Sequence, residues 1–363
     1  MQRMLALLAA SLLAGCSSSS KPAARVYSAT ASVGDFLVIT IHPDTLTIDY
    51  ENRTTSESGT VAYTVEPDGT YAITDPGGHL LSAYEIPGLA LVMEGDGMGP
   101  RGIEKALIVG VEKAPLVNAD LAGQSYAMLQ FRTHEGGVEV GHVTVADDGD
   151  VSVTNYIPAW ELYGRPSSFS FKEIPGENFV EDAATGSIEV TVPEEGGGTS
   201  TATIFGTPGG YLAIDGENGS MFGVRDAATK DFLPEYAGTY LAIAYSKHDV
   251  TLGPGPGEET GTAEITKATV TITAGTGGGH ILVEPEAGTP FESELVPLED
   301  VPEFYGTGKI EGHPNGLFVF RDEGGDAVFV VFMDRSLAFG RYRISDLAAR
   351  EYEYLYGFAL KQT

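Results

Sequence analysis

The sequence predicts an all-β chain built of tandem antiparallel meander modules. Apolar and polar residues alternate at period two in most segments after residue 30, as in 60–74, 138–154 and 268–273. Tight-turn motifs separate these segments, and the whole pattern recurs along the chain. Each module is expected to close as a small barrel or to stack as a sandwich. A single β-propeller is the alternative architecture.

Asp-Gly pairs mark two of the expected hairpins. Asp68-Gly69 and Asp148-Gly149 each separate two alternating runs, a pattern typical of a tight β-hairpin. The 47 glycines and 20 prolines indicate many turns rather than disorder, because the runs between them are strongly apolar. The one helix expected from the pattern is short and covers residues 345–351.

An internal repeat divides the chain. The same hairpin unit, with an apolar strand on each side of an acidic glycine-rich turn, occurs at residues 87–112, 208–226 and 314–334. Gly123 and Gly238 open equivalent strands and lie 115 positions apart (238 − 123), whereas a propeller blade spans about 40–50 residues. The repeat therefore predicts three β-modules, at residues 30–118, 119–232 and 233–363.

The N-terminus carries an export signal. Arg3 precedes an apolar run at residues 4–13, and the run ends in Leu13-Ala14-Gly15-Cys16. This stretch resembles the lipobox of bacterial lipoproteins. The resemblance implies a signal peptide at residues 1–15, a lipidated Cys16 that can carry palmitate, and a flexible tether over residues 16–29. It also implies a lipid-anchored place in the cell envelope, at the outer membrane, because Ser17 stands where an aspartate would favour inner-membrane retention.

Charge and cysteine content restrict the function. The formal net charge is −30, from 51 acidic and 21 basic residues, so the chain repels phosphate backbones and nucleic acid is excluded as a partner. Cys16 is the only cysteine, and its acylation leaves no thiol for a disulfide or a metal. The expected partners are the membrane, through the anchor, and an envelope polysaccharide or protein.

Catalytic motifs do not fit their required contexts. Ser125, in Gly-Gln-Ser-Tyr-Ala, opens a predicted strand, whereas a nucleophile elbow needs a strand before it and a helix after it. The seven histidines lack zinc-binding spacing. We therefore expect a non-catalytic binding or scaffolding role, for polysaccharide, an apolar ligand or a protein partner. An envelope glycan hydrolase with paired carboxylates and a structural surface-layer component are the alternatives.

Two groups of residues are candidate binding sites. Asp215, Glu217 and Asn218 lie in an acidic glycine-rich turn that offers oxygen ligands for calcium, although the turn is first a hairpin reversal. No other cofactor is expected. Tyr156, Trp160 and Tyr163 form an aromatic stretch that could stack on a sugar or, alternatively, seal the end of a barrel.

Overall fold

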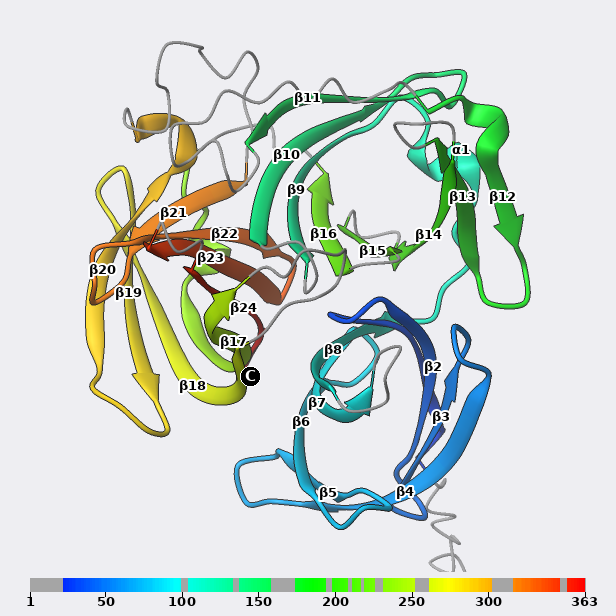
Figure 1. Ribbon diagram of the computed structural model, residues 1–363, viewed down its shortest axis with the longest axis horizontal. Helices are drawn as coiled ribbons and strands as arrows, with labels where there is room; N and C mark the ends of the chain where they lie inside the picture. Colours follow the sequence, from blue (N-terminus) through cyan, green and yellow to red (C-terminus); the bar gives the residue numbers. More distant parts are fainter. Residues whose placement is uncertain are drawn as a thin grey trace, which may run out of the picture.

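The chain folds as an all-β protein, as the sequence predicts (Figure 1). The computed structural model describes residues 22–98, 104–132, 137–157, 174–193, 198–207, 211–216, 219–225, 231–251, 261–301, 316–346 and 351–362. Within these ranges the strands form two closed barrels and one eight-stranded open sheet, rather than the blades of a propeller. Within the same ranges, no helix is long and apolar enough to cross a bilayer.

The first barrel is an eight-stranded antiparallel meander that closes by pairing β1 with β8. Its strands are β1 (Arg25–Ala31), β2 (Asp35–His42), β3 (Thr47–Asn52), β4 (Glu57–Val65), β5 (Tyr71–Thr74), β6 (Leu80–Ile86), β7 (Ala90–Met98) and β8 (Glu104–Glu112). Asp68-Gly69 joins β4 to β5 as expected, and Gly69 has the positive φ of 86° that this turn requires.

The second closed barrel repeats this meander at the C-terminal end of the chain and closes by pairing β17 with β24. Its strands are β17 (Gly238–Thr251), β18 (Thr262–Gly275), β19 (Gly278–Pro285), β20 (Phe291–Pro297), β21 (Leu317–Arg321), β22 (Ala327–Met333), β23 (Ser336–Asp346) and β24 (Glu351–Lys361). Short 3₁₀ helices cover Pro234–Tyr236 and Leu298–Asp300. The helix expected at residues 345–351 is wrong for its described part, because residues 345–346 end β23 and Glu351 begins β24.

The middle sheet is the same meander opened at one point. Its strands are β9 (Ser125–Arg132), β10 (Gly137–Val145), β11 (Val151–Ile157), β12 (Phe179–Asp182), β13 (Ser187–Pro193), β14 (Thr199–Thr207), β15 (Tyr211–Gly216) and β16 (Gly219–Arg225). The first strand, β9, pairs with the last, β16, as in the barrels. The sheet order runs from β11 to β12, so these two strands form its edges among the described residues. Helix α1 (Asn118–Leu121) and a 3₁₀ turn (Gly176–Asn178) flank the sheet.

One hydrophobic core joins all three sheets on their outer faces. Phe131 of the middle sheet stacks on Tyr356 of the C-terminal barrel with ring centroids 4.9 Å apart, and Tyr356 stacks on Tyr245 at 4.9 Å. Phe36 of the first barrel contacts Phe205 of the middle sheet at 5.5 Å. The central strands are thus buried on both faces, inside by their own sheet and outside by a neighbour.

We expect Phe131→Ala to lower the free energy of unfolding by about 3–5 kcal/mol, because it removes a ring from this shared core. Phe131 is 1% exposed, whereas Val180 is 62% exposed and provides the control Val180→Ala. Chemical denaturation measures both. A Phe131→Ala shift no larger than that of the control would show that the sheets do not depend on a common core.

Candidate functional site

The floor of the C-terminal barrel is closed by aromatic rings. Tyr236 stacks on Phe332 with centroids 4.3 Å apart, and Phe232 and Phe318 meet this pair edge-on at about 6 Å. The hydroxyl of Tyr240 donates to the carbonyl of Tyr236 at 2.7 Å, which fixes the 3₁₀ turn against the barrel. Close aromatic packing therefore seals this end without leaving a buried hydroxyl unsatisfied.

Above this floor lies a cavity of about 500 Å³ within the barrel. Inward-facing side chains of successive strands form its wall, because alternate residues of a strand point to the same face. The wall is mainly apolar, with Val270, Ile281, Val283, Phe291 and Val330 among its side chains. A cavity of this size and lining is typical of a site for a small apolar or amphipathic ligand.

A glycine keeps the lumen open beside Phe339. Phe339 of β23 is paired with Gly357 of β24, and a Cβ at Gly357 would lie 2.2–2.8 Å from three atoms of the Phe339 ring. The ring therefore lies directly over the glycine backbone instead of projecting further into the barrel. Any larger residue at 357 would displace the ring towards the cavity, which Phe339 lines.

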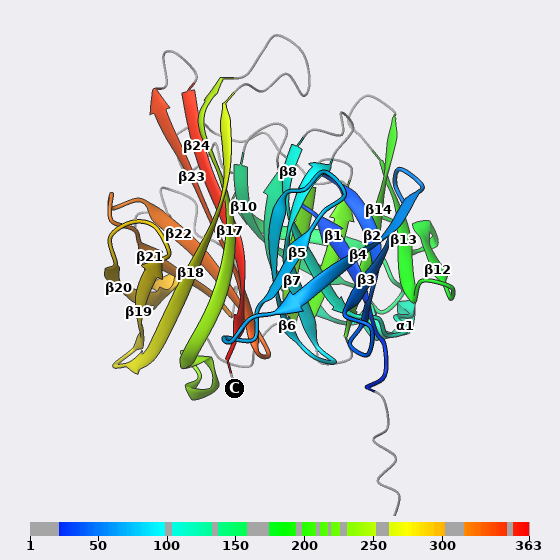
Figure 2. The ribbon, with the colours of Figure 1, turned by 90° about the horizontal axis from the view of Figure 1, so that it is seen from below.

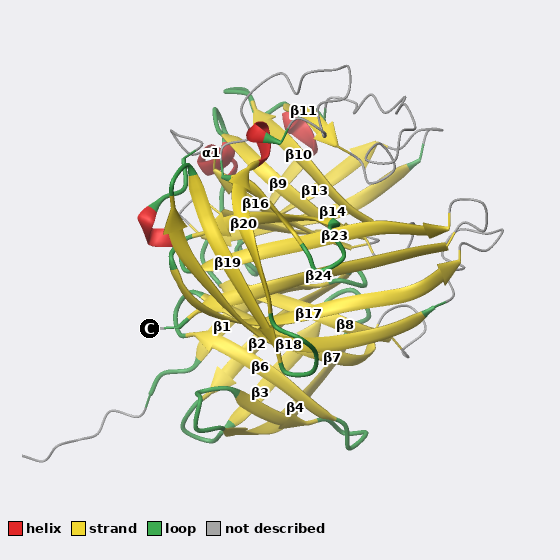
Figure 3. Cartoon of the chain, turned by 90° about the vertical axis from the view of Figure 1, so that its left-hand side faces the viewer, coloured by secondary structure: helices red, strands yellow, loops and turns green. Residues whose placement is uncertain are grey.

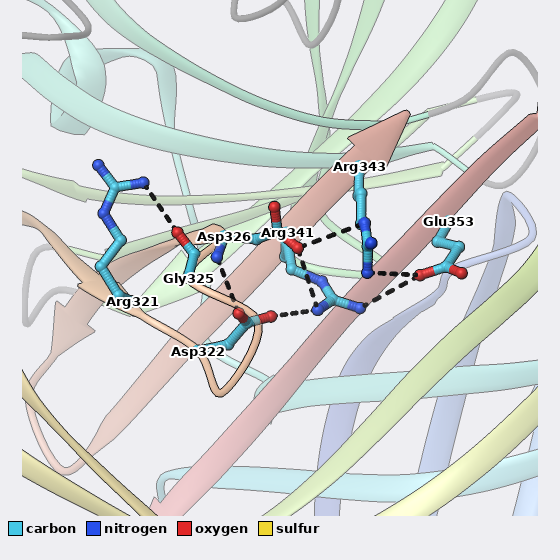
Figure 4. A network of polar contacts seen from close by, with 7 residues as sticks. All are labelled: Arg321, Asp322, Gly325, Asp326, Arg341, Arg343 and Glu353. Atoms are coloured by element: carbon cyan, nitrogen blue, oxygen red, sulfur yellow. Dashed lines mark hydrogen bonds and ion pairs between the residues drawn. The ribbon is translucent and has the colours of Figure 1, made fainter. Parts of the chain in front are cut away.

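The mouth of this cavity carries an ion-pair network (Figure 4). The Arg341 guanidinium donates to the Asp322 carboxylate and lies 4.0 Å from Glu353. Arg343 lies 3.5 Å from Asp326 and 3.7 Å from Glu353. The two arginine side chains come from β23, and the aspartates belong to the β21–β22 turn. The network holds this turn and two strands together at the rim.

The sequence indicates the acidic residues of this mouth but not the arginines. The repeat identifies the acidic turn at 322–326, but it does not identify Arg341 and Arg343 as partners of that turn. Their signal was available: two arginines at period two, in a chain with 21 basic residues among 363, share one face of a strand. The arginines lie 15 to 19 positions after their aspartate partners (341 − 326 and 341 − 322), so only the barrel register brings them together.

Asp215 lies at the junction of the first barrel and the middle sheet. The hydroxyl of Thr30 in β1 donates to the Asp215 carboxyl at 2.6 Å and lies 2.8 Å from the hydroxyl of Ser220. Burial, opposed by the Thr30 hydrogen bond and assisted by the nearby Asp35, raises the pKa of Asp215 to about 8. Asp215 thus serves as a neutral, buried contact between two sheets at neutral pH.

The remaining candidate residues lie partly or wholly outside the described ranges. Asp215 ends β15 and β16 begins at Gly219, so the stretch is a hairpin reversal, while Glu217 and Asn218 lie outside the described residues. No three His, Cys, Asp or Glu side chains of the described ranges are grouped to hold a metal ion. Calcium at Asp215, Glu217 and Asn218 stays a prediction. Cys16, Trp160 and Tyr163 lie outside the described residues, and Tyr156 is placed in β11 by its backbone alone.

Comparison with known proteins gives no family. No family model matches the chain, and no curated protein is significantly similar to it. Similar solved structures include two variants of the vaccine antigen transferrin binding protein B from Haemophilus parasuis, 10% and 11% identical, with TM-scores of 0.30 and 0.26. These alignments cover 94% of this chain and 76% and 77% of the antigen chains.

A third similar structure is a DUF3598-family protein of unknown function from Nostoc punctiforme, 10% identical with a TM-score of 0.21. Its alignment covers 69% of this chain and 100% of the other. Similarity at this level says nothing about what this chain binds.

We expect the stability of the protein to fall between about pH 4 and pH 8 because of Asp215. Its folded-state pKa is raised to about 8 from 3.8, so unfolding in this interval releases a proton and becomes easier as pH rises. Relative to Asp215→Asn, which cannot titrate, the wild type should lose about 1 kcal/mol of unfolding free energy per pH unit. Urea denaturation of both proteins at several pH values measures the difference; a pH-independent difference would contradict the expectation.

Proposed function

We propose that this chain is a lipid-anchored cell-envelope protein that binds a small apolar or amphipathic ligand inside the β17–β24 barrel without catalysing a reaction. The observation that supports this function is the cavity of about 500 Å³ with its apolar wall and aromatic floor. The cavity sits on regular strands in a closed barrel, so its shape is largely preformed, which lowers the entropic cost of binding.

The ion pairs at the mouth favour binding over catalysis. Asp322, Asp326 and Glu353 each lie within 4 Å of an arginine nitrogen, so their oxygens are engaged in holding the rim. A glycan hydrolase would instead need two carboxyl groups free to act on opposite sides of one bond. Polysaccharide and protein partners remain compatible with the outer surface.

The anchoring part of the proposal rests on the Leu13-Ala14-Gly15-Cys16 motif. The tether reaches the first barrel at Arg25, where β1 begins. In Figures 2 and 3 the start of β1 lies on the side of the molecule opposite the C-terminal end of β23, the strand that carries Arg341 and Arg343. A lipid on Cys16 would therefore join the β1 end of the first barrel to the membrane through the flexible tether.

Ligand binding is tested with N-phenyl-1-naphthylamine, an uncharged apolar fluorophore. We expect saturable binding by the wild type and at least about a tenfold loss of affinity at this site for Gly357→Val, which drives the Phe339 ring into the cavity. Fluorescence titration measures both, and far-UV circular dichroism checks that the variant folds.

A matched control exists in the first barrel, where Gly59 also lies beneath an aromatic ring. The variant Gly59→Val should leave naphthylamine binding to the β17–β24 barrel intact. Absence of saturable binding by the wild type, or equal binding by Gly357→Val at this site, would overturn the proposed ligand site.

We expect Cys16→Ala to release the protein from membranes, because acyl chains contribute about 0.8 kcal/mol per buried methylene to anchoring. Fractionation of cells that express each form measures the change, and Ser17→Ala serves as the control that retains the acceptor cysteine. A Cys16→Ala form that still sediments with the envelope would refute lipid anchoring.

A further inference from the structure

The β1–β8 barrel, called the cup below, is filled at one end by a polar network, whereas the β17–β24 barrel is filled there by aromatic rings. Glu85, whose side chain is 1% exposed, accepts hydrogen bonds from the hydroxyls of Tyr27 and Tyr71 and from the guanidinium of Arg25. Burial and the hydrogen bond to Glu85 raise the pKa of both tyrosines, so their hydroxyls remain protonated donors. This satisfied polar network fills one end of the barrel.

The opposite half of this barrel holds a cavity of about 600 Å³. The middle of its wall is apolar and includes Leu37, Ile39, Ile48, Ile73, Met93 and Ile108. Turns between strands make up its rim. The cavity therefore offers an apolar body and a distinct rim, and it is separate from the cavity of the β17–β24 barrel, with which it shares no lining residue.

An aromatic ring lies flat on the wall of the cup. Tyr50 of β3 pairs with Gly59 of β4, and a Cβ at Gly59 would lie 2.7 Å from the Tyr50 hydroxyl oxygen and 2.9 Å from two carbons of its ring. The hydroxyl end of the Tyr50 side chain therefore lies over the glycine, where any larger residue would displace it. Tyr50 also lines the cavity, so its ring can contact a ligand in the lumen.

The rim of the cup is acidic. Asp35, Glu57, Asp75 and Asp96 line the cavity. His79 offsets part of this charge, because its ring nitrogen lies 3.0 Å from Asp75 and 3.3 Å from Asp96, and these contacts raise the pKa of His79. Lys105 lies near enough to His79 to lower that pKa slightly. Unlike the other barrel, this rim has no arginine among its described lining residues.

Two of the rim acids, Asp75 and Asp96, are bridged by His79 and do not form a metal site. Within the described parts of the chain, no three acidic or histidine side chains are placed to hold a metal ion. A diffuse negative potential next to an aromatic face and an apolar wall suits a larger organic cation, since quaternary ammonium groups bind to aromatic faces. The apolar wall then accommodates the hydrocarbon part of the same molecule.

We propose that the β1–β8 barrel is a second ligand site, selective for amphiphiles with an alkylammonium head. The cationic head lies against the Tyr50 ring and the acidic rim, and the alkyl chain extends along the wall formed by residues such as Ile39, Ile73 and Ile108. The site goes beyond the ligand proposed for the β17–β24 barrel and does not depend on it.

The test compares three probes with eight-carbon chains, octyltrimethylammonium, 1-octanol and octanoate, each below its micelle concentration or solubility limit. Isothermal titration calorimetry of the wild type should show the ammonium probe binding most tightly and octanoate least tightly. Added salt should weaken binding of the ammonium probe but leave octanol binding nearly unchanged, because salt screens the rim charges.

Variants assign the binding to this cup. Tyr50→Leu should weaken octyltrimethylammonium binding about 3- to 30-fold while leaving octanol nearly unchanged, because it removes the ring but keeps apolar volume. Glu57→Gln should weaken only the ammonium probe, by about 2- to 5-fold. Gly59→Val, which displaces Tyr50 into the cup, should weaken all binding there.

The control is Gly357→Val, which alters the other barrel and should leave ammonium affinity unchanged. If the wild type binds octanoate as tightly as octyltrimethylammonium, or if Tyr50→Leu and Gly59→Val bind the ammonium probe like the wild type, the inference is wrong. Either result would leave the β17–β24 site standing if naphthylamine binding remains sensitive to Gly357→Val. The two proposed sites can therefore be disproved separately.

Discussion

The hydrophobic core between the three sheets is the constraint on which the structure depends. A closed barrel buries its inner face by itself, so burial of its outer face demands a neighbour. Here Tyr245 stacks on Tyr356 within the C-terminal barrel, and Tyr356 stacks on Phe131 of the middle sheet. Phe36 of the first barrel packs against Phe205 of the middle sheet. Gly340 of β23 permits this approach, because a Cβ there would lie 2.7–2.9 Å from Val138 and Phe131 side-chain atoms. The modules are therefore parts of one packed body rather than separate units on a string.

The sequence predicted the class, the turns and the repeat because these follow from local chemistry. Alternation marks strands with one buried face, and Asp68-Gly69 marks a hairpin through a backbone angle that glycine adopts freely. The sequence indicates the shared core less clearly than it indicates the strands and turns. β22 (Ala327–Met333) is apolar at nearly every position, and its residues are almost all buried, which is typical of a strand covered on both faces. That run was interpreted only as a strand, because nothing local distinguishes a covering by another module from a covering by its own barrel.

The cavities could not be predicted for a related reason. Whether an eight-stranded barrel is filled or hollow depends on cross-strand pairs, and these depend on register. Tyr50 opposite Gly59 and Phe339 opposite Gly357 place a ring over a glycine in each closed barrel. The sequence holds 47 glycines, most of which are suited to turns, so a glycine that makes room for a ring is invisible without the pairing. The same holds for Asp215. The sequence indicates a turn residue, but its contact with Thr30, 185 positions away, depends on how the sheets pack.

The two closed barrels differ mainly at their ends, and their cavities therefore have rims of different charge. In both, the filled end lies near the point where the first strand begins: Arg25 and Tyr27 belong to β1, and Tyr236 directly precedes β17. The open ends carry the residues that vary, with acids at one rim and arginine–carboxylate pairs at the other. Closed antiparallel barrels tolerate such variation because the wall hydrogen bonds fix the fold and the turns at the rim contribute little to it. A duplicated meander can therefore keep its register and its floor while each rim acquires its own charge, and the selectivity of each cavity follows from its rim.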